Sequence, residues 1–195
     1  GDYYKLTLMS PFFDPGPIQH PDIPIYIAGV NTGLAQLAGE VADGFHVHPL
    51  HSARYLQEVI LPAIETGVAQ NGRTRRDIAV SVPVFVATNP DEQSITRQQI
   101  SFYASTPSYR SVFDLHGWGD IAERLSALAA RGKWGEMPEQ ISDQMLATFA
   151  VVAAPEEVAS VLKERYQELV DRLGLYIPFR PGERDSFWSH LLKEF

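Results

Sequence analysis

The stretch from Pro24 to Pro49, PIYIAGVNTGLAQLAGEVADGFHVHP, changes its apolar period twice and so constrains the fold more than any other part of the chain. Residues 25–30 form an apolar run of strand length. From Thr32 the apolar residues recur every three or four positions, which is typical of an amphipathic helix. Gly44 ends that pattern, and residues 45–48 (FHVH) predict a second short strand. Strand, helix and strand in this order indicate a parallel pair joined by a crossover helix.

The alternation of strand and helix continues along the chain. The apolar pattern predicts a helix over 52–70, a strand over 77–88 (DIAVSVPVFVAT), a helix over 155–173, a strand over 175–179 (LYIPF) and a terminal helix over 183–195. Pro83 interrupts the third strand, which indicates a bulge or a missing partner in the hydrogen-bond ladder. Four strand–helix units in series predict an α/β fold with a parallel sheet.

Two segments fall outside this alternation. Residues 1–23 carry four prolines and no helical period, so we expect an irregular arm. Residues from about 89 to 147 form a helical insert that leaves the carboxyl end of a strand, where lids commonly lie. In this insert we expect Phe102 and Phe113 to pack between helices, whereas Tyr103 and Tyr109 are open to either packing or a pocket.

The sheet has two possible closures. It is either an open doubly wound sheet of four strands or half of an eight-stranded barrel. In both architectures ligands bind at the carboxyl ends of the strands. That rule selects four places in this chain, namely residues 28–33, 46–51, 88–90 and 180–182.

The turn AGVNTG, Ala28 to Gly33, is the first of these places. Backbone N–H groups at a helix start, together with the helix dipole, make an anion site suited to phosphate. The alternative is a tight turn in which Asn31 or Thr32 only caps the helix. The spacing matches neither a Walker loop nor a complete dinucleotide fingerprint, so the residues themselves leave both interpretations open.

Two histidines and one arginine are further candidates. His46 and His48 alternate along one strand and therefore share a face, close to the strand end where pocket side chains lie. Ordinary hydrogen-bonded histidines are the alternative, and we expect no metal site because the segment contains no HExxH motif or comparable set of ligands. Arg180 follows the last strand and is suited to an anionic substrate or an acidic cofactor group. We assign His48 and Arg180 to a substrate pocket.

The composition disfavours some classes of partner and indicates a cellular compartment. The net charge of −8 argues against nucleic acid or an anionic membrane as a partner. No apolar run reaches the roughly 18 residues of a membrane span. The chain has no cysteine, which excludes disulfides and thiolate chemistry and fits a reducing cytosol. We therefore expect a cytoplasmic protein.

The stretch from Pro24 resembles the luciferase-like monooxygenase superfamily, especially its oxidoreductases that depend on coenzyme F420. The matching positions are Pro24, Ile27, Ala28, Ala38, Gly39, Glu40, Ala42, Asp43 and Gly44. The similarity continues through YLQEVILPAIETG, through FYASTPSYR with HGWGD, and through PEEV. It covers nearly the whole chain from Pro24 onward.

The resemblance implies a TIM-type barrel that binds reduced F420 or FMN at its carboxyl face. It implies that residues 24–195 are the last four strand–helix units of the eight, and that His46 lies beside the cofactor ring. It also implies that backbone amides of the turn hold the cofactor phosphate, at Ala28, Gly29, Val30, Asn31, Thr32 and Gly33. Many relatives have Gly or Ser where this chain has Val30 and Asn31. Catalytic residues are not assigned.

The expected function is that of a flavin- or F420-dependent oxidoreductase or monooxygenase acting on a small organic substrate. Such an enzyme performs either hydride transfer or oxygen activation. The alternative is a non-catalytic flavin-binding or assembly protein of the same fold. A TIM-barrel aldolase or isomerase with a phosphate site ranks lower, because no lysine or carboxylate is found at a strand end.

A half barrel has consequences for partners. It leaves two unpaired strand edges and an inner face that we expect to be rich in Val and Ile. We therefore expect a homodimer, or the missing N-terminal half of the barrel as a partner, and no activity from this segment alone. The start at Gly1 rather than at Met agrees with a piece of a longer protein.

Overall fold

The computed structural model describes residues 2–5, 7–8 and 10–195. The strands are β1 (Tyr26–Gly29), β2 (Gly44–Val47), β3 (Ala79–Ala87), β4 (Ala150–Val152) and β5 (Arg172–Leu175). The helices before the insert are α1 (Thr32–Val41), α2 (Ala53–Tyr55), the π-helix η1 (Leu56–Ile60), α3 (Leu61–Gln70) and the 3₁₀ turn η2 (Arg75–Asp77). Those that follow are α4 (Pro90–Ala104), η3 (Pro107–Tyr109), α5 (Arg110–Asp114), α6 (Gly119–Ala130), η4 (Trp134–Glu136), η5 (Pro138–Gln140), α7 (Asp143–Phe149), α8 (Val158–Tyr166) and α9 (Asp185–Lys193).

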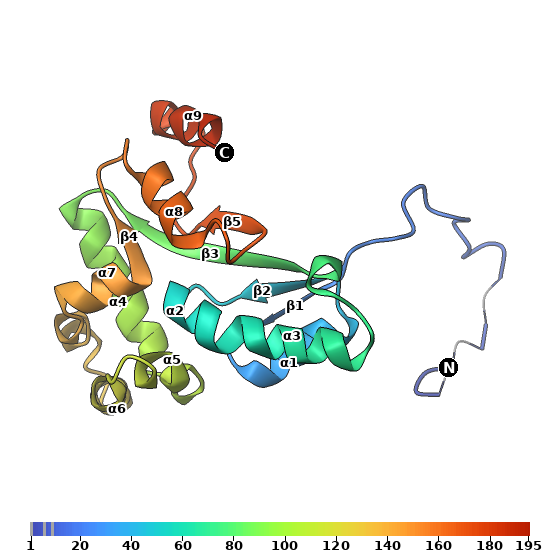
Figure 1. The fold of residues 1–195 in the computed structure, drawn as a ribbon, viewed down its shortest axis with the longest axis horizontal. Helices are drawn as coiled ribbons and strands as arrows, with labels where there is room; N and C mark the ends of the chain where they lie inside the picture. The colour runs from blue at the N-terminus through green and yellow to red at the C-terminus, as the bar shows by residue number, and fades with distance from the viewer. Residues whose placement is uncertain (1, 6, 9) are drawn as a thin grey trace.

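All strand pairs are parallel, as the sequence predicts. The strands lie in the order β1-β2-β3-β4, and β5 also pairs with β3, which is therefore the central strand. The register places four residues in one row across the sheet: Ala28, His46, Ser81 and Arg172. Figure 1 shows the helices of the insert, α4 to α7, gathered at the carboxyl end of β3.

The helices cover one face of the sheet, so the fold is a partial barrel and not a doubly wound sheet. Val80, Val82 and Val84 on β3 are fully buried, whereas Ser81 and Pro83 between them are partly exposed. We call the uncovered side the inner face. The expected Val- and Ile-rich inner face is wrong: Val80, Val82 and Val84 pack against the helices, and the other side of β3 carries Ala79, Ser81, Pro83, Phe85 and Ala87.

Two glycines allow α1 and α3 to pack closely on the covered face. A Cβ on Gly39 would lie 2.4 Å from the carbonyl oxygen of Ile64, and one on Gly67 would lie 2.0 Å from that of Gln36. The two helices thus approach backbone to backbone over β1 and β2. This contact holds α1 against α3, and α1 begins where the turn after β1 ends.

Pro83 lies where β3 changes partners on one edge. The carbonyl oxygens of Val80 and Val84 accept hydrogen bonds from the N–H groups of Asp171 and Tyr176, at the two ends of β5. In a parallel strand the backbone groups of alternate residues point to opposite edges, so those of Pro83 point to the other edge. On that edge the pairing with β2 ends at Ser81 and the pairing with β4 begins at Phe85. The missing N–H of Pro83 therefore falls in a gap between two partners, which confirms the expected missing ladder partner.

The largest differences from the prediction lie between the insert and the chain end. The three-residue strand β4 has no counterpart in the prediction, because it is too short to show a period and directly continues α7. Helix α8 ends at Tyr166 and not at residue 173, and the last strand covers 172–175 and not 175–179. Leu169 and Leu173 continue the helical spacing by coincidence. The predicted helix over 52–70 is present, interrupted by the π-helix η1.

The N-terminal arm extends away from the sheet (Figure 1). Its described residues before β1 belong to no helix or strand, and they expose large apolar side chains such as Tyr3, Tyr4 and Phe12. Gly1, Leu6 and Met9 of the predicted arm lie outside the described residues. Within the described part of the chain, no helix has the length and apolar character needed to cross a membrane.

Candidate functional site

The turn after β1 presents an uncapped helix start. Strand β1 ends at Gly29 and α1 begins at Thr32; Asn31 stands at the cap position, but its side chain makes no capping hydrogen bond. The first turn of α1 contains no acidic residue, and a Cβ on Gly33 would meet no atom within 4 Å. The N–H groups of this turn are thus free of the side-chain cap that the alternative interpretation required. A helix start of this kind favours an anion.

The side chain of Asn31 joins the turn to the insert instead. Its Nδ2 donates to the carbonyl of Ser108 at 3.0 Å, and its Oδ1 accepts from the hydroxyl of Ser111 at 2.7 Å. The hydroxyl of Tyr55 lies 3.0 Å from that of Ser111 and donates to the carbonyl of Val30 at 3.2 Å. The turn is therefore held by η3 and α5 on one side and by α2 on the other.

A group of aromatic side chains lies next to this junction. The carboxyl-end cluster consists of His48, Phe85, Tyr103, Tyr109 and Tyr176. The ring centroid of His48 is 4.6 Å from that of Tyr103 and 4.5 Å from that of Tyr109. The hydroxyls of Tyr103 and Tyr176 are 2.9 Å apart, and Phe85 meets Tyr176 edge-on at 5.1 Å. Residues of β3, α4 and η3, and of the loops that follow β2 and β5, thus form one aromatic wall at the carboxyl edge.

The cluster is uncharged at neutral pH. The Nδ1 of His48 accepts from the backbone N–H of Leu50 at 3.1 Å, so Nε2 carries the proton of the neutral ring. Burial lowers the pKa of His48 to about 4. Burial, and then the hydrogen bond to Tyr176, raises the pKa of Tyr103 to about 12. The wall therefore offers hydrogen-bond donors and flat apolar surface without a net charge.

His46 has different surroundings from His48. It lies on the inner face between Ala28 and Ser81, and its side chain is exposed. His48 follows the end of β2 and packs against the insert. His51, the third histidine of this segment, is a core residue: it is 1% exposed, and its Nδ1 donates to the carbonyl of His48 at 2.9 Å.

Arg180 lies apart from the other candidates. Its side chain is 71% exposed, and its carboxylate neighbour is Glu183 at 3.4 Å. The arginine at the carboxyl end of β3 is Arg184, whose guanidinium donates to Glu92 at 2.6 Å and to the hydroxyl of Thr88 at 3.0 Å. Glu92 also accepts from the backbone N–H of Thr88. This network fastens the start of α9 to the end of β3.

No pattern in the sequence marks several of these residues as part of a functional site. Phe85 belongs to an apolar run, and Tyr176 to the LYIPF segment, whose strand is displaced from the predicted position. Their meeting with Tyr103 depends on the tertiary path of the insert. Phe113 packs in the core as expected, but the expected packing of Phe102 is wrong, since it is 54% exposed. Among the described residues no three His, Asp or Glu side chains are grouped to hold a metal ion.

Comparison with known proteins identifies one family for this chain. A profile of the family described as luciferase-like monooxygenase matches residues 1–172. An uncharacterized protein of Mycobacterium tuberculosis (strain H37Rv), Rv1360, is 42% identical over 179 residues, which are 89% of this chain and 53% of that protein. The 5,10-methylenetetrahydromethanopterin reductase of Archaeoglobus fulgidus is 24% identical over 193 residues, covering 95% of this chain and 56% of the reductase.

A solved structure supports the fold. The coenzyme F420 dependent tetrahydromethanopterin reductase from Methanopyrus kandleri superposes with a TM-score of 0.68 at 22% identity, over 90% of this chain and 50% of that one. This likeness shows that the parallel sheet and its helices follow the same path. The chain spans about half the length of the relatives that it matches.

Proposed function

Because this chain belongs to the luciferase-like monooxygenase family, we propose that it is the part of an F420-dependent oxidoreductase that holds the cofactor and one wall of the substrate pocket. The similarity to the reductases from Archaeoglobus fulgidus and Methanopyrus kandleri, the second of which depends on coenzyme F420, supports reduction over oxygen activation and F420 over FMN. When bound, the deazaflavin supplies hydride transfer. The substrate is a small organic molecule.

The observation that carries this proposal is the continuity between the turn and the carboxyl-end cluster. Ser108, which accepts from Asn31, precedes Tyr109, whose ring lies against His48. An anion site and a neutral aromatic wall are thus adjacent. A cofactor with a phosphate group and a flat ring system fits both together.

Each residue has a defined part in this arrangement. The amides of residues 28–33 would hold the phosphate, while Asn31 keeps the turn against the insert. The ring would lie along the wall of His48 and Tyr103, with His46 at the inner face as its further neighbour. The Nε2–H of neutral His48 would donate to a substrate oxygen. The assignment of Arg180 to an anionic part of the substrate or cofactor stays a prediction, because its exposed side chain lies apart from the other candidates.

Titration with both cofactors tests the proposal. F420 and FMN are added separately to the 195-residue chain, and binding is followed by the change in cofactor fluorescence. We expect saturable binding of F420 and weaker binding of FMN. Tighter binding of FMN would contradict the cofactor assignment, and binding of neither would overturn the proposal. Binding without turnover in the intact oxidoreductase would favour a non-catalytic cofactor-binding protein.

A further inference from the structure

The aromatic wall of the carboxyl-end cluster continues within the insert into a second aromatic pair. The ring centroid of Phe102 lies 5.5 Å from that of Tyr103, a member of the cluster, and 6.3 Å from that of Trp134 in η4. Phe102 and Trp134 are both 54% exposed, although large aromatic side chains are mostly buried in folded proteins. Two adjacent rings in water beside a proposed pocket indicate a surface that a ligand covers.

A cavity of about 390 Å³ opens beside these two rings. Its other lining residues come from α4 and from the segment 135–138: Gln98, Ser101, Gly135, Met137 and Pro138. Small-molecule pockets have volumes of roughly 300–1,000 Å³, and this cavity falls within that range. A stable protein interface needs about 800 Å² from each partner, far more than two exposed aromatic side chains supply. The cavity therefore suits a small molecule better than a second chain.

The described residues that line this cavity include no ionisable side chain. Lys133 and Glu136, which flank Trp134 along the chain, form an ion pair with each other at 2.8 Å. The hydroxyl of Ser101 donates to the carbonyl of Gln98 at 2.9 Å, whereas the exposed side-chain amide of Gln98 bonds to no other described residue. The cavity therefore favours an uncharged ligand that has a flat ring and one hydrogen-bonding group.

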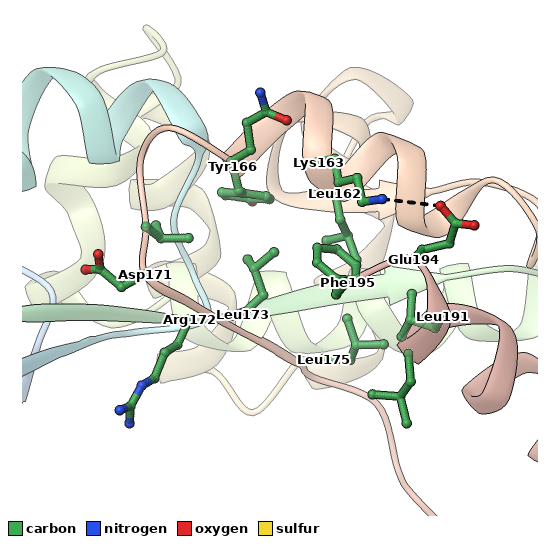
Figure 2. Close-up of a pocket in the computed structure, with 13 residues that line it drawn as sticks. Leu162, Lys163, Tyr166, Asp171, Arg172, Leu173, Leu175, Leu191, Glu194 and Phe195 are labelled. Atoms are coloured by element: carbon green, nitrogen blue, oxygen red, sulfur yellow. Dashed lines mark hydrogen bonds and ion pairs between the residues drawn. The ribbon is translucent and has the colours of Figure 1, made fainter.

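A larger cavity of about 520 Å³, between β5, α8 and α9, lacks both the uncharged lining and the contact with the cluster. Figure 2 shows Lys163, Asp171, Arg172 and Glu194 among its lining residues, with the ion pair of Lys163 and Glu194 drawn as a dashed line. None of its lining residues belongs to the carboxyl-end cluster. The cavity beside Phe102 is thus the one that continues the proposed pocket.

We propose that Phe102 and Trp134 form an outer subsite, which binds an uncharged aromatic end of the substrate while the reacting part lies at the wall of His48 and Tyr103. This inference rests on the proposed function, because it takes that wall as the place of the cofactor ring. Aromatic rings attract one another at centroid distances of about 4.5–7 Å. The rings from His48 through Tyr103 and Phe102 to Trp134 follow one another at such distances, so an elongated substrate can lie along them.

Fluorine NMR of the 195-residue chain labelled with 5-fluorotryptophan tests the subsite. The chain has three tryptophans, and Trp134→Phe identifies the Trp134 signal by its loss. The probe is 2-naphthol, an uncharged aromatic with one hydroxyl group. We expect 2-naphthol to shift the Trp134 signal saturably and to bind about fivefold more tightly than decahydro-2-naphthol, which has a similar size but no aromatic ring. Its carboxylate analogue, 2-naphthoate, should bind more weakly than 2-naphthol.

Two phenylalanine variants locate the binding. Phe102→Ala should weaken 2-naphthol about fivefold and leave F420 affinity unchanged, because the exposed Phe102 ring lies beyond the wall that faces the cofactor. Phe179→Ala is the matched control, since Phe179 is also exposed and its ring lies 5.4 Å from that of Trp188, away from this cavity. This control should leave the affinity for 2-naphthol unchanged. Saturating F420 should also leave it unchanged.

The outcomes separate this proposal from the proposed function. An unmoved Trp134 signal, or equal affinity for 2-naphthol and 2-naphthoate, would overturn the subsite while F420 binding still stands. Equal shifts of the Trp134 and Trp188 signals would show non-specific adsorption and would also overturn it. Displacement of 2-naphthol by F420 would place the probe at the cofactor site instead. Binding of 2-naphthol by a chain that does not bind F420 would overturn the assignment of the subsite to the substrate, together with the proposed function.

Discussion

The hydroxyl of Ser111 donates to the Oδ1 of Asn31 at 2.7 Å, and so connects α5 of the insert to the turn after β1 across 80 residues of sequence. Tyr55 joins the same pair from α2, with its hydroxyl 3.0 Å from that of Ser111. The position of the insert relative to the proposed phosphate site therefore depends on three side chains.

Ser111→Ala and Tyr55→Phe should each lower the free energy of unfolding by about 1 kcal/mol, because each removes a partly buried hydrogen bond. Since the two hydroxyls share one network, the double variant should lose less than the sum of the single losses. Urea denaturation of the four proteins measures this coupling. Strictly additive losses would show that the two hydroxyls act independently.

Gly33 is the position at which the proposed phosphate site is tested most cleanly. Gly33→Asp places a carboxylate in open space at the helix start, where the free protein tolerates it. A bound phosphate about 5 Å away would be repelled by roughly 3 kcal/mol at an effective dielectric of about 20, before screening. We expect the dissociation constant of F420 to rise at least about tenfold.

The matched control is Gly33→Ala, which should stabilise the chain by about 0.5–1 kcal/mol and leave cofactor affinity nearly unchanged. If Gly33→Asp binds F420 as tightly as the original chain, the turn does not hold the phosphate. Asn31→Asp is less informative, because it removes the amide that donates to Ser108.

His51 should make the protein sensitive to mild acid. Burial lowers its pKa to about 4, against 6.5 for the ordinary side chain. The unfolded chain therefore binds more protons between these values, so the stabilisation is complete above pH 6.5 and is lost as the pH falls toward 4. For this fully buried group the free energy of unfolding falls by up to about 3 kcal/mol.

Denaturation midpoints from pH 7 to pH 4 measure this dependence. His51→Asn should flatten the curve, whereas His20→Asn in the exposed arm should leave it unchanged. An equally steep curve for His51→Asn would mean that other groups bind the extra protons. His48, whose pKa is lowered to about 4 by partial burial, should add a smaller contribution in the same direction.

Gly67→Ala should destabilise the chain by about 1–3 kcal/mol. The new methyl group would lie 2.0 Å from the carbonyl oxygen of Gln36, so α1 and α3 would have to move apart. Thermal unfolding measures the loss, and Gly33→Ala is again the control, with a gain in place of a loss. A stabilised Gly67→Ala protein would show that the two helices are not in backbone contact.

The sequence predicts those helices and strands in which burial of one face requires apolar residues at a regular spacing. The valines of β3 and the apolar stripe of α1 are examples, since each must face the core at fixed spacing. The boundary between α8 and β5 was misplaced for the same reason: Leu173 satisfies the helical spacing and the strand alternation equally. The valines were also assigned to the wrong face, because alternation gives two faces without saying which one helices cover.

The candidate site was predictable only where its chemistry lies in one local segment. The turn at residues 28–33 and His48 belong to such segments. The hydrogen bonds of Asn31 to Ser108 and Ser111, and that between Tyr103 and Tyr176, join residues more than 70 positions apart. No spacing rule reports contacts of that separation, because the fold of the insert decides them.

Pro83 determines where strands can slide along β3. A strand that shifts lengthwise needs an unbroken series of donors to pair with in its new position, and Pro83 removes one donor between the places of β2 and β4. Each neighbour is therefore restricted to its own end of β3. A single proline thus separates two registers, because neither β2 nor β4 can shift past it and keep all of its hydrogen bonds.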